Sequence, residues 1–141
     1  MIKITEQLIH GCVTQLSTTK GCYFTVVYGL NEGSQRIPHW NDLMGLGLSH
    51  QPWVILGDFN VVKTVAEKTG TYPPSTVDMA AFNACSDNCG LDDLNRIGCE
   101  FTCTTNPDAG RRIASTLDRA LVPSRGRHIF PTSFAFFFLG T

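Results

Sequence analysis

The sequence Gly-Asp-Phe-Asn at residues 57 to 60 places a carboxylate and a carboxamide directly after an apolar segment. The preceding residues, 53 to 56, form a continuous apolar run that is typical of a buried strand. A carboxylate at the carboxyl end of such a strand lies at the sheet edge where α/β proteins bind ligands. There Asp58 can bind a metal ion or accept a proton from water. Asn60 can reach the same side because side chains alternate. The alternative interpretation is an ordinary polar turn after a strand.

Three further polar residues stand where they can act together with Asp58. Tyr28 lies at the end of a β-branched and aromatic run, and Asn31 follows it; both side chains can donate hydrogen bonds to a phosphate. Asp118 stands inside an apolar run, where a carboxylate is costly unless it is paired. It can therefore orient a histidine. The alternatives are a half-buried tyrosine at a strand end, and an Asp118 that pairs with neighbours of Arg119 or with a backbone amide.

The elements that position these residues alternate between strands and helices, which predicts an α/β fold with mixed sheets in one domain, residues 1–141. Helices are expected from Arg36 to about Leu48 and from Thr76 to Gly90, where apolar residues recur at helical spacing and Gly90 can end the second helix. The expected strands are residues 8–13, 23–30, 53–57, 91–94, 101–105, 113–122 and 132–139. A strong turn signal, residues 106 to 110, separates the strands 101–105 and 113–122.

The six cysteines favour reduced structural thiols. Cys85 and Cys89 share one face of the second expected helix with Phe82, as core residues do. Their four-residue spacing differs from the two-residue spacers of common zinc sites, and no histidine pair accompanies them. The amino terminus lacks a secretory signal and no apolar run approaches the ~18 residues of a membrane span. The sequence therefore predicts an intracellular protein without a membrane partner.

The charge distribution is asymmetric although the net charge is only −1. Residues 1–94 are predominantly acidic, whereas residues 95–141 carry six arginines against three acidic residues. Arginine is well suited to bidentate phosphate contacts. A non-catalytic nucleic-acid-binding module that uses this Arg-rich C-terminal part is thus an alternative function. A solvated basic face explains the same charges.

Taken together, these motifs resemble the endonuclease/exonuclease/phosphatase superfamily, and in detail the endonuclease domain of plant LINE-type (non-LTR) retrotransposons, a relative of DNase I. The strings that carry the resemblance are Tyr28-Gly-Leu-Asn31, Trp53-Val-Ile-Leu-Gly-Asp58-Phe-Asn60, Gly90-Leu-Asp-Asp-Leu, Gly98-Cys-Glu-Phe101-Thr102 and Ser115-Thr-Leu-Asp118-Arg-Ala-Leu-Val. The resemblance runs from about Leu8 to the end. It implies part of a four-layer α/β sandwich with two facing mixed β-sheets, truncated at both ends. It also implies Mg²⁺-dependent phosphodiester cleavage, with DNA as partner and a nuclear location if genomic DNA is the substrate.

The resemblance also implies roles for single residues. Tyr28 and Asn31 match positions that contact and orient the scissile phosphate. Asp58 matches the carboxylate that works with a histidine to activate water, and Asn60 matches the amide that steadies the reacting oxygens. Asp118 matches the acid that orients the histidine.

Further matches concern the approach to DNA. Thr102 and the turn from Asn106 to Arg112, which includes Arg111, match the hairpin that approaches DNA. Cys103 stands where relatives commonly have tryptophan. The oligomeric state does not follow from the sequence.

The chain departs from the family pattern at two essential positions. Glu6 and Glu32 do not match the context of the metal-binding glutamate, and no histidine stands in a Ser-Asp-His motif. Asp58 alone is a weak, incomplete metal site, because Mg²⁺ prefers further carboxylate or phosphate oxygens. The sequence therefore predicts a fragment without useful nuclease activity on its own. Apolar strand residues such as Val26 and Ile55 are expected to lack a partner, and the run from Phe134 to Leu139 is expected to promote aggregation.

Overall fold

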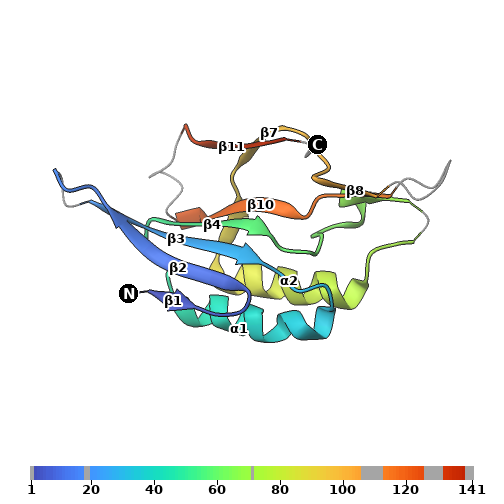
Figure 1. Ribbon diagram of the computed structural model, residues 1–141, viewed down its shortest axis with the longest axis horizontal. Helices are drawn as coiled ribbons and strands as arrows, with labels where there is room; N and C mark the ends of the chain where they lie inside the picture. Colours follow the sequence, from blue (N-terminus) through green and yellow to red (C-terminus); the bar gives the residue numbers. More distant parts are fainter. Residues whose placement is uncertain (1, 18–19, 71, 106–112, 126–131, 139–141) are drawn as a thin grey trace.

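The computed structural model describes residues 2–17, 20–70, 72–105, 113–125 and 132–138 (Figure 1). Its largest element is a six-stranded mixed sheet in the order β1-β2-β3-β4-β10-β6. The strands of this sheet are β1 (Lys3–Ile4), β2 (Leu8–Thr14), β3 (Gly21–Tyr28), β4 (Trp53–Asp58), β10 (Asp118–Pro123) and β6 (Leu91–Asp93). The first three strands form an antiparallel meander, β3 and β4 are parallel, and β10 runs antiparallel to both β4 and β6.

Two helices cover one face of this sheet (Figure 1). α1 (Ile37–Leu46) follows a short 3-10 turn, η1 (Gly33–Arg36), and forms the crossover between β3 and β4. α2 (Thr76–Cys89) begins where the Ser75 side chain accepts a hydrogen bond from the Asp78 N–H. Both helices end at a glycine in the left-handed conformation, Gly47 and Gly90, as expected for such caps.

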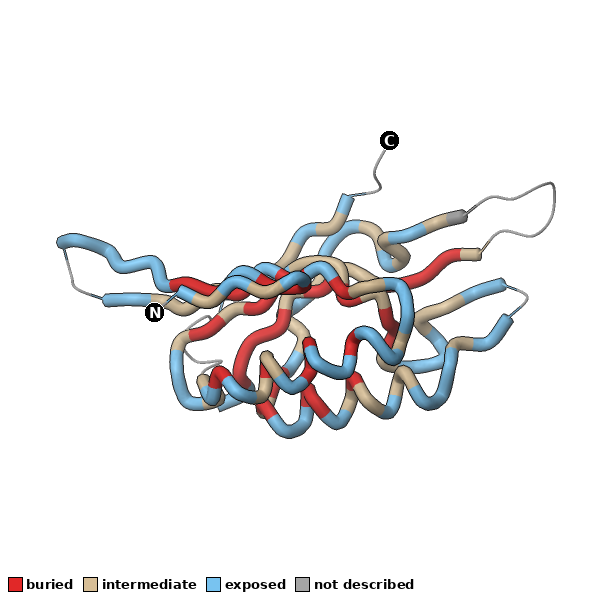
Figure 2. The backbone as a smooth tube through the Cα atoms, turned by 60° about the horizontal axis from the view of Figure 1, so that its bottom comes forward, coloured by how far each residue is buried: buried red, intermediate tan, exposed pale blue. Residues whose placement is uncertain are grey.

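The hydrophobic core lies between the helices and the sheet. Figure 2 shows buried residues both along the strands of the sheet and in the two helices. The sheet contributes Trp53 and Ile55, both fully buried, and the helices contribute Trp40 and Phe82, whose rings stack at 5.1 Å. Cys85 and Cys89 are buried free thiols on α2, and the six cysteines are free, as predicted.

The opposite face of the sheet carries an exposed apolar row. The register aligns Ile4 with Ile9, Ile9 with Val26, and Val26 with Leu56, and all four side chains are at least 41% exposed. This confirms that the face of Val26 lacks cover among the described residues. The expectation for Ile55 is wrong, because the alternation of side chains turns this residue toward the helices.

Two smaller sheets complete the described structure. A parallel pair joins β7 (Asn95–Gly98) to β11 (Phe134–Phe137). A three-stranded sheet contains β5 (Lys68–Thr69), β9 (Ile113–Ser115) and β8 (Cys103–Thr105), with a 3-10 turn, η2 (Val65–Glu67), before β5.

One predicted strand is wrong in its extent. Residues 113–122 form two strands in different sheets, β9 and β10, rather than one. The break occurs at Thr116 and Leu117, whose backbone N–H groups donate to Glu67 O and to the Thr102 hydroxyl instead of to a ladder. The α/β class with mixed sheets is confirmed. None of the helices in the described part of the chain has the length and apolar character needed to span a membrane.

Candidate active site

Tyr28, Asp58 and Asp118 lie side by side across three neighbouring strands. Tyr28 on β3 pairs in register with Asp58 on β4, and Asp58 pairs in register with Asp118 on β10. In the antiparallel β4–β10 pair, side chains of directly opposite residues share one face and have Cβ atoms roughly 4.5–5.5 Å apart. Tyr28 is the neighbour of Asp58 on the other side, in the parallel β3–β4 pair. The structure therefore brings the three residues together where β3 and β4 end and β10 begins, on the sheet face away from the helices. We call this place the sheet edge. The chemical roles of the three residues stay predictions.

Two glycines allow the chain to pass close to itself at this edge. Gly57 has a φ of 136°, and a Cβ there would lie 2.1 Å from the carbonyl oxygen of Val27. A Cβ at Gly29 would lie 2.5 Å from the carbonyl oxygen of Phe59. Any side chain at either position would separate β3 from β4 at the residues that precede Asp58 and follow Tyr28. The glycine of the Gly-Asp-Phe-Asn motif is therefore needed for geometry rather than for chemistry.

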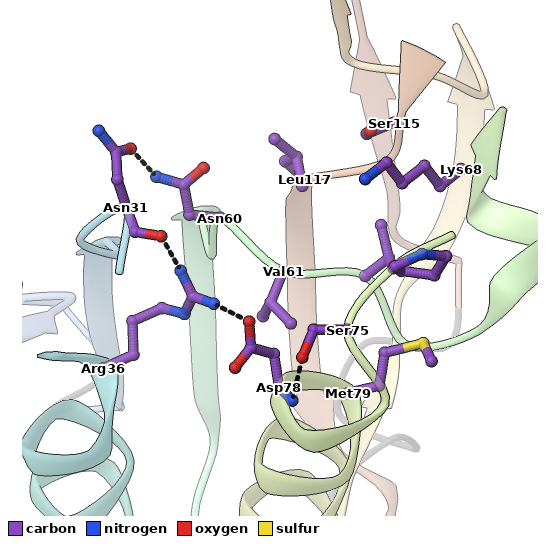
Figure 3. A pocket seen from close by; sticks show the side chains of 12 residues that line it. Asn31, Arg36, Asn60, Val61, Lys68, Ser75, Asp78, Met79, Ser115 and Leu117 are labelled. Atoms are coloured by element: carbon purple, nitrogen blue, oxygen red, sulfur yellow. Dashed lines mark hydrogen bonds and ion pairs between the residues drawn. The ribbon is translucent and has the colours of Figure 1, made fainter. Parts of the chain in front are cut away.

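Asn60 links the ends of the two strands. It adopts a left-handed conformation with a φ of 56°, which asparagine tolerates better than most residues. Its backbone N–H donates to Asp58 Oδ1 at 2.8 Å, and its side-chain Nδ2 donates to Gly29 O at 2.9 Å and to Asn31 Oδ1 at 2.8 Å. Figure 3 shows Asn31 and Asn60 facing each other, with the Asn31 amide nitrogen directed away. The two predicted amides are thus coupled to each other and to Asp58.

The Asp58 carboxyl group has a raised pKa. Partial burial is the main cause, and the negative charge of Asp118 raises the pKa further. The N–H of Asn60 and the more distant charge of Arg36 act in the opposite direction. A cation beside Asp58 and Asp118 would lower the pKa of Asp58 again, because a positive charge favours the ionised carboxylate.

Thr102 holds the backbone of Asp118. Its hydroxyl oxygen accepts hydrogen bonds from the N–H groups of Leu117 and Asp118, both at 3.0 Å. Arg96 Nη1 donates to the carbonyl oxygen of Asp118 at 3.0 Å. This positioning function of Thr102 and Arg96 was not expected from the sequence. The DNA contact expected of Thr102 stays a prediction, and Arg111 and Arg112 lie outside the described residues.

Arg36 is a second positioning residue that the sequence did not reveal. It is only 3% exposed, and its Nη1 donates to the carbonyl oxygens of Leu30 at 2.7 Å and Asn31 at 2.9 Å. Its Nη2 forms an ion pair with Asp78 at 3.2 Å (Figure 3). Arg36 therefore fastens the loop that carries Asn31 to the start of α2. Its position five residues after Asn31 was the only available signal, and it is a weak one.

Arg119 points to the opposite side of the sheet from Asp118. Its side chain is 1% exposed and forms ion pairs with Glu67 and, at 3.0 Å, with Asp93. Glu67 and Asp93 are themselves carboxylates, so neither is a partner for Asp118, and the alternative that Asp118 pairs with another neighbour of Arg119 stays a prediction. The guanidinium groups of Arg119 and Arg96 therefore contact groups of the domain itself: Arg119 forms ion pairs, and Arg96 donates to the Asp118 carbonyl oxygen.

The histidines of the described part are engaged elsewhere. His10 bonds to the Thr25 hydroxyl at 2.8 Å, His39 is buried in α1 against Trp40, and His50 contacts Arg125. Within the described residues, no cluster of three or more His, Cys, Asp or Glu side chains has the arrangement of a metal site. The expectation that Asp58 binds a metal ion weakly stays a prediction.

No family model and no curated protein matches the sequence. Solved structures do match the fold. The endonuclease domain of TRAS1, a telomere-specific non-LTR retrotransposon, matches with a TM-score of 0.66 and 13% identity, over 88% of this chain and 53% of that chain. A β-hairpin deletion mutant of beta toxin from Staphylococcus aureus matches with a TM-score of 0.62 and 13% identity, over 96% of this chain and 49% of that chain. The chain spans about half the length of these structures, and it has the DNase I-like α/β fold of which a retrotransposon endonuclease domain is one example.

Proposed function

We propose that this chain binds a phosphodiester of DNA at the sheet edge where Tyr28, Asp58 and Asp118 meet. It does so as the remnant of a Mg²⁺-dependent endonuclease of a plant LINE-type retrotransposon, and it has no useful cleavage activity alone. The observation that supports this proposal is the strand register, which places a phenol and two carboxylates side by side on an open face. The fold of the TRAS1 endonuclease domain is consistent with it.

The donors at this edge suit a phosphate group. The Tyr28 side chain is 63% exposed, so its hydroxyl is free to reach a ligand on the open face. Asn31 is exposed and directs its amide nitrogen away from Asn60. The hydrogen bond between Asn31 and Asn60 fixes both amides before a ligand arrives, which lowers the entropic cost of binding.

The carboxylates fit Mg²⁺ when a phosphate supplies further oxygens. Mg²⁺ is commonly held by one or two carboxylates together with substrate phosphates and water. Asp58 and Asp118 would hold the ion, and the raised pKa of Asp58 indicates a site that would gain from positive charge. Once bound, Mg²⁺ would supply neutralisation of the phosphoryl charge. Asp58 and Asn60 would orient a water molecule at the same edge.

Cleavage needs a group that takes the proton of the attacking water. His10, His39 and His50 lie elsewhere in the described structure, so Asp118 has none of them to orient. Asp58 remains as the acceptor, and its Oδ1 is already bonded to the Asn60 N–H. We therefore expect binding of DNA without turnover.

The test combines a binding assay with a nicking assay. Anisotropy of a labelled oligodeoxynucleotide should show binding that Mg²⁺ strengthens. Tyr28→Phe should weaken it about tenfold, the effect of one hydrogen bond to a charged group. Asp58→Ala should remove the Mg²⁺ dependence. Tyr72→Phe is the control for the loss of an exposed tyrosine hydroxyl, because Tyr72 is 68% exposed and lies in none of the strands that carry the site.

Two outcomes would contradict the proposal. Binding that neither Tyr28→Phe nor Asp58→Ala changes would place the DNA elsewhere. Robust Mg²⁺-dependent nicking of plasmid DNA that Asp58→Ala abolishes would show an active endonuclease rather than a remnant.

A further inference from the structure

A pocket of about 240 Å³ adjoins the candidate active site and is separate from its carboxylates (Figure 3). Asn31 and Asn60 form the wall that the pocket shares with the site. The pocket extends from there toward the start of α2 and the three-stranded sheet. Its volume is below the ~300–1,000 Å³ of sites for drug-sized ligands. It therefore suits one unit of a larger ligand that is also held elsewhere.

Lys68 gives this pocket a positive charge. Figure 3 shows its side chain extending from the far wall, with the ammonium group directed toward Leu117 and the side of Asn60. The other two charged side chains of the lining, Arg36 and Asp78, form an ion pair with each other and offset their charges. Among the ion pairs of the described residues, none involves Lys68. The pocket therefore favours an anionic group near Lys68.

The fold fixes the position of Lys68 through its neighbour Glu67. The Glu67 side chain is paired with buried Arg119, and its carbonyl oxygen accepts the Thr116 N–H at 2.9 Å. Lys68 itself lies opposite Ser115 in the β5–β9 pairing, and both residues line the pocket. The backbone of Lys68 is thus anchored on both sides, while its side chain extends into the pocket.

The remaining lining is partly polar and partly apolar. Ser75 and Ser115 contribute hydroxyl groups, and the apolar side chains are those of Val61, Val62, Pro74, Met79 and Leu117. A lining that combines a cation, hydroxyl groups and apolar side chains matches the chemistry of a nucleotide, in which a sugar and base adjoin a phosphate. An independent inorganic anion would gain nothing from the apolar part of this lining.

We propose that the pocket holds the nucleotide next to the phosphodiester at Asp58, with its phosphate on Lys68 and its sugar or base against Met79 and Leu117. This inference rests on the proposed function, because the strand must already be bound at the neighbouring edge. Asn31 and Asn60, shared by both places, separate the two successive phosphates. Lys68 is then a binding residue for the flanking strand and not part of the catalytic machinery.

The first test uses the wild-type protein and its methionine methyl groups. The chain has three methionines, of which Met79 lines the pocket and Met44 lies in α1. In protein labelled with ¹³C at these methyl groups, a short oligodeoxynucleotide should shift the Met79 signal and leave the Met44 signal in place. Inorganic phosphate alone should shift neither. An equal Met79 shift with phosphate would overturn the nucleotide assignment, because the pocket would then be a simple anion site.

The second test measures the contribution of Lys68 to binding. Lys68→Gln should weaken oligodeoxynucleotide binding about fivefold, the effect of one partly exposed ion pair. It should also lower the slope of log affinity against log salt by about 0.7, the value for one phosphate contact on a single strand. Lys68→Arg should restore both values. Lys20→Gln, which removes the same charge beyond the opposite end of β3, should change neither.

The outcomes separate this inference from the proposed function. If Lys68→Gln binds DNA as the wild type does, while Tyr28→Phe and Asp58→Ala still weaken binding, the pocket assignment is wrong and the proposed function stands. If the wild-type chain binds no oligodeoxynucleotide, both are wrong.

Discussion

Asp118 lies directly opposite Asp58 in the antiparallel pairing of β10 and β4, and its negative charge contributes to the raised pKa of Asp58. The two carboxylates are therefore held together at a cost to the fold that a ligand can offset. Raised pKa values from burial and like charge are common at functional sites. This relationship leads to a prediction about stability.

Asp58→Asn should stabilise the chain near neutral pH while it impairs metal-dependent binding. A carboxyl group whose pKa is higher in the folded state than in the unfolded state costs stability when ionised. That cost is absent below the unfolded pKa of 3.8 and grows as pH rises through the folded pKa. Denaturant titrations at pH 7 and pH 3.5 should therefore show a gain for Asp58→Asn at pH 7 only. An equal loss of stability at both pH values would contradict this account, and Asp87→Asn, on the exposed side of α2, is the control.

His39 should make the fold sensitive to acid. Its ring is 1% exposed, neither ring nitrogen has a hydrogen-bond partner within the described structure, and burial lowers its pKa from 6.5 to about 4. The nearby Asp42 raises this pKa and Arg36 lowers it, but burial dominates. Because the unfolded state takes up the proton first, stability should fall by about 3 kcal/mol between pH 6.5 and pH 4. His39→Leu should remove this part of the pH dependence, whereas His50→Leu should leave it unchanged.

The ion pair between Glu67 and Arg119 should be important for folding. In Glu67→Gln, the Arg119 guanidinium stays almost fully buried, but only the carboxylate of Asp93 remains to compensate its positive charge. Loss of one partner of a buried pair costs about 3–5 kcal/mol, and the low end is expected here. Lys3→Met breaks the partly exposed pair with Asp42 and should cost at most about 1 kcal/mol. Similar losses for the two variants in urea unfolding would show that burial of Arg119 is not decisive.

The two faces of β4 should respond differently to substitution. Leu56 on the open face is 41% exposed, so Leu56→Gln should change stability by less than about 0.5 kcal/mol and should improve solubility. Ile55 is fully buried under the helices, so Ile55→Ala should cost about 2–5 kcal/mol. Equal costs in chemical denaturation would mean that another surface covers Leu56.

The sequence predicted the α/β class and the placement of Tyr28 and Asp58 at strand ends, because strand residues have a strong local pattern. Asp118 was expected inside the strand 113–122, whereas it begins β10. The prediction failed for Ile55, because the direction of a side chain in a continuous apolar strand has no alternation signal. It also failed at residues 113–122, where the N–H groups of Thr116 and Leu117 donate to distant Glu67 and Thr102 and break an otherwise uniform strand. Arg36 and Arg119 were missed as structural residues because their partners are remote in the sequence.

The candidate site and the hydrophobic core lie on opposite faces of the large sheet. The helices pack on Trp53 and Ile55, whereas Asp58 and Asp118 project from the other side of the same strands. Substitutions that destroy the site therefore leave the core unchanged, and some of them relieve electrostatic repulsion. Loss of the site and loss of the fold are therefore independent events for this chain, and a variant without Asp58 or Asp118 keeps the surfaces that the core supports.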